Sequence, residues 1–266
     1  MIKYKHYSLF GGNRMEKPIV FISHITEEKE MALELKQLIE ESFLGMLSVF
    51  VSSDENSISS GSRWLDNITS ALGNCAIELI LCSPKSVKRP WINFEAGAGW
   101  IREIPVIPLC HSGMEPSSLP VPLNLLQAAK ISEMSNLKLI FPVLASAIGA
   151  KCPNVMFDDF IGRMKELERK YSFWNEINLS LNQLYCNYPE IFERIKNGNS
   201  LVKLRDTELK ELEEILKPLT NRGYICLLKT GDWELANQGM RYGVAITSSQ
   251  EYKDLFLDKE CKFYNS

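Results

Sequence analysis

The chain has 266 residues, a formal net charge of −3, 45% hydrophobic residues and 24% charged residues, which allows one large domain or two small ones. No apolar run approaches the roughly 20 residues that a membrane-spanning helix needs, so no membrane partner is expected. The slightly acidic balance provides no overall basic field to attract nucleic acid.

Cysteine and histidine usage argues against two further classes of protein. The 7 cysteines are scattered without a CxxC pair, and the 3 histidines are dispersed. An odd cysteine count with this spacing favours neither a disulfide framework nor a zinc site, so we expect no metal. Free thiols are typical of a reducing compartment, and we predict a cytoplasmic protein.

The chain begins with a polar segment, residues 1–17, which we interpret as an N-terminal extension rather than a signal peptide. The run PIVFIS at 18–23 is β-branched and aromatic, which predicts a buried strand. Thr26 precedes a group of acidic residues, a pattern typical of a helix start, and apolar residues at helical spacing continue to Phe43.

Strands and helices continue to alternate up to about residue 150. Further strands are predicted at 47–53, 77–82, 104–110 and 128–132, and helices at about 62–73, from Pro90 onward and at 133–150. This alternation predicts an α/β fold with a flavodoxin-like, parallel five-stranded sheet covered by helices on both faces. Gly149 and Pro153 place the end of this domain, residues 18–150, near its last helix.

Residues 151–266 have a different pattern. Charged amphipathic helices are predicted at 158–172, 174–195 and 206–217, followed by two β-like runs within 223–247 and a short helix at 249–256. A helix, a hairpin and a helix in this order predict a mainly helical, winged-helix-like domain.

The sharpest chemical motif is the pair Trp91 and Glu95. Their spacing places both side chains on one face of a helix. An indole beside a carboxylate partly removes it from water, which raises its pKa, and a carboxylate can stabilise the oxocarbenium-like centre of a glycosidic cleavage. The same residues at this spacing also fit an aromatic side chain packed on a core helix with a solvated glutamate beyond it.

A second motif is the polar loop at 54–61, which leads from a strand into a helix, where open α/β sheets bind ligands. Ser57 is a small donor, Gly61 permits an unusual backbone angle, and the helix start near Trp64 offers amide groups to a phosphate. An ordinary surface loop is the alternative.

The same edge of the sheet carries further polar residues. Ser23 and His24 follow the first strand, and Ser83 follows the third. His24 is either an acid or base or a residue that hydrogen-bonds locally. Together, the motifs predict one ligand site on this rim.

Three separated segments carry a family resemblance. FISHITEEKEMALELKQLIEESF at 21–43, VFVSSDENSISSGSRWLDNITSAL at 49–72 and IELILCSPKSVKRPWINFEAGAGW at 77–100 resemble successive parts of TIR domains. The likeness is clearest to bacterial TIR proteins, many of which serve in anti-phage immunity. Two departures are the continuation AGAGW and residues 151–266, which lie outside the resemblance.

The resemblance implies an enzyme that takes NAD as substrate rather than cofactor and releases nicotinamide by hydrolysis or cyclisation. It implies that Glu95 is the catalytic carboxylate, that Trp91 lines the pocket, and that Gly61 lies in a loop over it. It also implies activity that depends on association between TIR domains. The other rim residues are expected to bind substrate: Ser57, Trp64, Ser23, His24 and Ser83.

Two other functions are open. A non-catalytic TIR scaffold would act through contacts between TIR domains alone, but it has no chemical need for a carboxylate beside Trp91. A DNA-binding regulator would use Arg222, Lys229 and Arg241, but these cations are sparse among acidic residues. Since nucleic-acid binding needs a basic patch, we expect the C-terminal domain to receive a protein or ligand trigger instead.

Overall fold

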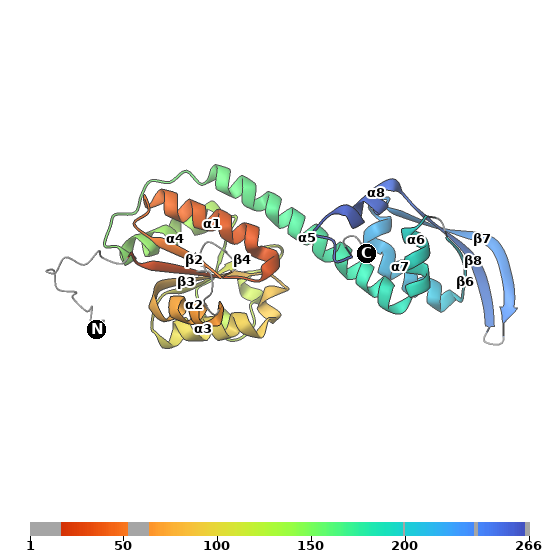
Figure 1. Ribbon diagram of the computed structural model, residues 1–266, viewed down its shortest axis with the longest axis horizontal. Coiled ribbons are helices and arrows are strands. Elements are labelled where there is room, and N and C mark those ends of the chain that lie inside the picture. Colours follow the sequence, from red (N-terminus) through yellow and green to blue (C-terminus); the bar gives the residue numbers. More distant parts are fainter. Residues whose placement is uncertain (1–16, 53–63, 199, 237–238, 264–266) are drawn as a thin grey trace. The chain divides into compact units, whose positions relative to one another are not determined.

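The computed structural model describes residues 17–52, 64–198, 200–236 and 239–263 (Figure 1). Its backbone contacts divide the chain into two compact units, residues 1–168 and 169–266. The first unit therefore includes residues 151–168, which lie beyond the predicted end of the first domain. The predicted N-terminal extension lies, apart from Lys17, outside the described residues.

The first unit is built on a parallel five-stranded sheet with the order β2-β1-β3-β4-β5. The strands are β1 (Ile19–Ser23), β2 (Ser48–Val51), β3 (Cys75–Cys82), β4 (Val106–Cys110) and β5 (Ala129–Lys130). The central strands are almost wholly buried, as expected for a parallel sheet that helices cover on both faces. The predicted α/β fold with five parallel strands is confirmed.

Four helices cover this sheet, α1 and α4 on one face and α2 and α3 on the other (Figure 1). They are α1 (Lys29–Ser42), α2 (Trp64–Asn74), α3 (Pro90–Ile101) and α4 (Met134–Ala147). Short 3-10 turns lie between them: η1 (Thr26–Glu28), η3 (Ser86–Lys88), η4 (Pro116–Ser118) and η5 (Leu123–Leu125). Pro90 occupies the first turn of α3, where the fixed φ of proline suits a helix start.

The second unit is mainly helical with a small antiparallel sheet, as predicted. Its helices are α5 (Asp158–Asn187), which begins in the first unit, α6 (Pro189–Lys196), α7 (Asp206–Thr220) and α8 (Gln250–Asp254), followed by the turn η6 (Leu255–Leu257). Its strands, in the order β6-β8-β7, are β6 (Ser200–Leu204), β7 (Ile225–Ala236) and β8 (Gly239–Ser248). A winged-helix domain contains a helix-turn-helix, which has two consecutive helices. In the described chain, α7 alone lies between β6 and β7, so a helix-turn-helix does not connect these two strands.

The predicted break between helices at 172 and 174 is wrong. α5 continues through these residues because its buried apolar positions keep helical spacing from Phe160 through Trp174 to Leu184. The helix ends before Pro189 instead, where Tyr188 has a φ of −138°. A residue that precedes proline is disfavoured in the helical region, so the proline determines this boundary.

Candidate active site

The carboxyl end of β1 and one face of α3 bring Ser23, Trp91 and Glu95 together. The Ser23 hydroxyl donates a hydrogen bond to Glu95 Oε2. The indole Nε1 of Trp91 donates to Glu95 Oε1 at 2.6 Å. The four-residue spacing on α3 thus places the indole directly against the carboxylate, and the end of a parallel strand supplies the second donor.

Glu95 is almost completely removed from water, with 1% of its surface exposed. This burial raises the pKa of its carboxyl to about 7, although the hydrogen bonds from Ser23 and Trp91 lower it. Glu95 therefore exchanges between its neutral and ionised forms near neutral pH. Its ionised form is a negative charge in surroundings that screen it little, so it acts strongly on any cationic centre nearby.

A second buried carboxyl, that of Glu78 on β3, lies beneath the same helix. Neither of its oxygens has a hydrogen-bond partner among the described residues. Burial and, secondly, the charge of Glu95 raise its pKa to about 8, while Arg102 lowers it. A Cβ on Gly99 would collide with Glu78 Oε2, so the backbone of α3 passes close to this carboxyl.

Sequence reasoning did not single out Glu78. The one available signal is its position as the only charged residue in the apolar run of β3, CAIELILC. A charged side chain in such a strand is either paired or protonated, because an unpaired buried charge is costly. The surroundings of Glu78 favour the protonated form at neutral pH.

His24, predicted as an acid, a base or a local hydrogen-bonding residue, is buried between the ends of β1 and β2. Its Nδ1 lies 3.3 Å from the carbonyl oxygen of Ile22 and 3.4 Å from the Ser52 hydroxyl. Burial lowers the pKa of the imidazole below 6.5, so it is neutral at pH 7. These contacts agree with the local hydrogen-bonding alternative.

Ser83 lies in a separate polar cluster. Its hydroxyl donates to Glu28 Oε1 at 2.7 Å and exchanges hydrogen bonds with Ser86, and the side chain is fully buried. Hydrogen bonds thus join Ser23 to Glu95 and Ser83 to Glu28. The predictions for Ser57 and Gly61 lie outside the described residues, and of Trp64 only the backbone is described, at the start of α2.

The described part of the chain lacks two features, a membrane-spanning helix and a cluster of metal ligands. None of its helices is both long enough and apolar enough to cross a bilayer. Nor does it contain a group of three or more His, Cys, Asp or Glu residues able to hold a metal ion.

Comparisons with known proteins give a match over the first unit. Residues 20–140 match the family model described as TIR domain. Among solved structures, the chain is similar to the TIR domain of the Toll-related receptor TRR-2 from Hydra magnipapillata, with 19% identity over 48% of this chain and 96% of that chain and a TM-score of 0.38. No curated protein gives a significant match. The family match includes Ser23, Glu78 and the Trp91–Glu95 pair, and ends before α5.

Proposed function

This chain is a TIR-domain protein, and from that premise we propose that its TIR domain cleaves NAD between nicotinamide and ribose, with Glu95 as the catalytic carboxylate. The observation that carries the proposal is the enclosed carboxylate of Glu95, held by Ser23 and Trp91. It stands at the carboxyl edge of a parallel sheet, where open α/β folds bind their ligands. The family also includes enzymes that cleave NAD.

The proposed chemistry needs one negative charge and no proton donor. The nicotinamide of NAD is already a cationic pyridinium, so it leaves as a neutral molecule when the glycosidic electron pair moves to its nitrogen. The ribose carbon left behind becomes cationic, and the Glu95 carboxylate stabilises this developing charge. Water then captures the carbon and loses a proton, giving ADP-ribose, or a nitrogen of the adenine captures it, giving a cyclic product.

The described arrangement is closed around Glu95. The Trp91 indole occupies one carboxylate oxygen, and Trp91 also stacks on Phe94 with ring centroids 5.2 Å apart. A substrate must therefore displace the indole from Glu95 to reach it. A hydrogen bond to a charged group contributes about 1.5–3 kcal/mol net, an amount that contacts between TIR domains can supply for this opening.

A nicotinamide-release assay tests the proposal. Wild type, Glu95→Gln and Glu103→Gln are incubated with NAD under crowding that promotes association, and products are identified by mass. Glutamine keeps the shape of Glu95 but removes its charge, so a loss of about 100-fold or more is expected. Glu103, an exposed glutamate just after α3, is the matched control and should retain wild-type activity. A Glu95→Gln rate within about threefold of wild type at equal melting temperature contradicts the assignment.

The second candidate is a scaffold without catalysis, and the outer surface of α3 favours it. Phe94, Trp100 and Ile101 are 57%, 50% and 83% exposed. Exposed apolar side chains on one helix suit a protein contact, and TIR domains commonly self-associate. If wild type cleaves no NAD under any condition that promotes association, this second function takes the place of the first.

For the physiological role, we propose an effector or signal producer in bacterial antiviral defence, triggered by a protein or ligand through the second unit. The support is the resemblance of the three TIR motifs to bacterial immune proteins. Phage challenge of cells that express wild type or Glu95→Gln tests it. Protection by wild type alone is expected, and equal protection by both proteins contradicts a catalytic role in defence.

A further inference from the structure

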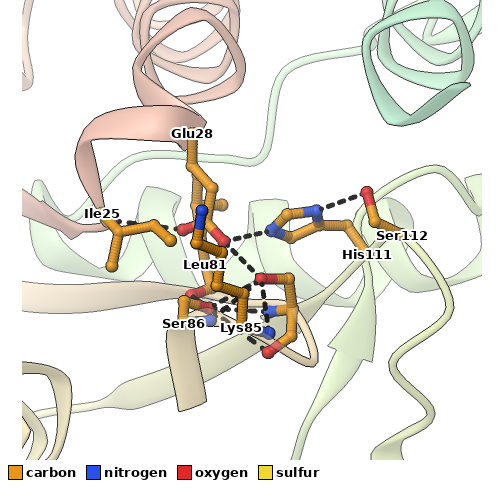
Figure 2. Close-up of polar contacts among 8 residues, drawn as sticks. Ile25, Glu28, Leu81, Lys85, Ser86, His111 and Ser112 are labelled. Carbon is orange, nitrogen blue, oxygen red and sulfur yellow. Dashed lines mark hydrogen bonds and ion pairs between the residues drawn. The ribbon is translucent and has the colours of Figure 1, made fainter. Parts of the chain in front are cut away.

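Glu28 joins three segments of the first unit (Figure 2). The side chain is fully buried at the end of η1. Its Oε1 accepts the Ser83 hydroxyl at 2.7 Å and lies 3.2 Å from His111 Nε2, while its Oε2 accepts the backbone N–H of Ile25 at 3.2 Å. One carboxylate therefore holds together the loop after β1, the loop after β3 and the end of β4.

Two of these loops also carry the contacts of Glu95. The loop after β1 begins directly after Ser23, which donates to Glu95. The loop after β3 is closed by Ser86, whose hydroxyl accepts the Ser83 N–H at 2.7 Å and donates to the Leu81 carbonyl at 3.1 Å. It leads through η3 into the first turn of α3, where Trp91 lies. A displacement of Glu28 would therefore move both hydrogen-bond donors of Glu95.

His111 completes the cluster after β4. Its side chain is fully buried, with Nε2 toward Glu28. Its Nδ1 lies 3.0 Å from the Ser112 hydroxyl, on the side of the ring away from Glu28 (Figure 2). The imidazole therefore has one polar neighbour on each side, which determines its orientation.

We propose that Glu28 and His111 are positioning residues that hold Ser23 and Trp91 in place to hydrogen-bond Glu95. The contacts lead from His111 to Glu28 and from Glu28 to the loops after β1 and β3. The expected change in kcat rests on the proposed function. The expected change in the Trp91–Glu95 hydrogen bond does not.

The indole N–H resonance of Trp91 in the full chain gives a readout that is independent of activity. It is assigned by its loss in Trp91→Phe. Two replacements of His111 separate its two contacts, because the amide nitrogen of asparagine stands near the place of Nδ1 and that of glutamine near the place of Nε2. His111→Asn removes the Glu28 contact and should shift the Trp91 resonance. It should also lower kcat for nicotinamide release by roughly tenfold or more with KM within about twofold.

His111→Gln keeps a nitrogen near Glu28 and should restore much of kcat relative to His111→Asn. A purely structural role for His111 would lower the melting temperature without this difference in kcat between the two variants. If both variants have the same kcat at equal melting temperature, positioning by the Nε2 contact is wrong.

Ser83→Ala tests the same cluster without changing His111, because it removes the hydroxyl that donates to Glu28. It should also shift the Trp91 resonance. An unshifted resonance in folded Ser83→Ala overturns the proposal, even if the His111 variants do not fold. Absence of nicotinamide release by wild type would overturn only the proposed function, because the resonance still decides the positioning.

Discussion

Two regions at the same edge of the sheet bury carboxyl groups in opposite ways. In the cluster of Glu28, Ser83 and His111, both carboxylate oxygens have close polar partners, including a histidine. Among the described residues, Glu95 of α3 has two neutral donors, one of them the partly exposed Trp91, and Glu78 beneath this helix has no hydrogen-bond partner. The first arrangement favours stability. The second perturbs both carboxyl pKa values, which is typical of functional sites.

The largest expected effect on stability is in the Glu28 cluster. Glu28→Ala removes the carboxylate that holds three segments and leaves buried polar groups behind, so the free energy of unfolding should fall by about 3–5 kcal/mol. Denaturant unfolding followed by indole fluorescence measures it. Glu27→Ala is the control, since this exposed neighbour forms a surface ion pair with Lys85 at 2.6 Å and should cost at most about 1 kcal/mol. Equal losses of unfolding free energy in Glu28→Ala and Glu27→Ala would contradict a stabilising role for the Glu28 cluster.

Glu78→Gln should raise stability at neutral and alkaline pH, whereas Glu28→Ala should lower it. The folded pKa of Glu78 is about 8, above its ordinary value of 4.5, so the folded state holds a proton that the unfolded state releases. Wild type therefore loses stability as pH rises from about 4.5 to about 8, and the variant lacks this loss. Melting temperatures from pH 5 to 9 should show an advantage of Glu78→Gln that grows and then levels off above about pH 8. A constant difference across this range contradicts a protonated Glu78.

A matched pair of glycines tests the close approach of α3 to the sheet. A Cβ on Gly99 would lie 2.6 Å from Val106 Cγ2 and would also collide with Glu78, whereas a Cβ on Gly97 meets nothing within 4 Å. Gly99→Ala should therefore destabilise the first unit by about 1–3 kcal/mol. Gly97→Ala should stabilise it by about 0.5–1 kcal/mol through helix propensity. Thermal unfolding compares them, and a stabilised Gly99→Ala would mean that both Glu78 and Val106 can move away.

The smallest expected effect concerns the Trp91 hydrogen bond. Trp91→Phe keeps an aromatic ring but removes the donor that lowers the pKa of Glu95, so this pKa should rise. Because the ionised form is the proposed catalyst, the acidic limb of the pH profile of nicotinamide release should move to higher pH. Phe94→Leu, which leaves both hydrogen bonds of Glu95 in place, is the control. An unmoved limb in Trp91→Phe would show that the indole does not tune Glu95.

Local patterns predict the fold and the Trp91–Glu95 contact, but not the Glu28 cluster. Apolar runs mark the strands, and a spacing of four residues on a helix determines which side chains meet. Glu28 and His111 come together only through the sheet topology, and no short-range pattern connects them. β6 was missed because its five residues, SLVKL, alternate too briefly to separate from a loop.

The continuity of α5 across the two units limits how the chain can be divided. Phe157, Phe160 and Met164 are buried in the first unit, where the Phe157 ring meets Phe141 with centroids 4.8 Å apart. Arg163 adds an ion pair with Glu34 at 2.6 Å. A fragment that stops at residue 150 would expose the apolar surface that these residues cover. The smallest autonomous fragment of the TIR unit should therefore extend to about residue 168, and limited proteolysis should leave this junction intact while it cleaves exposed loops.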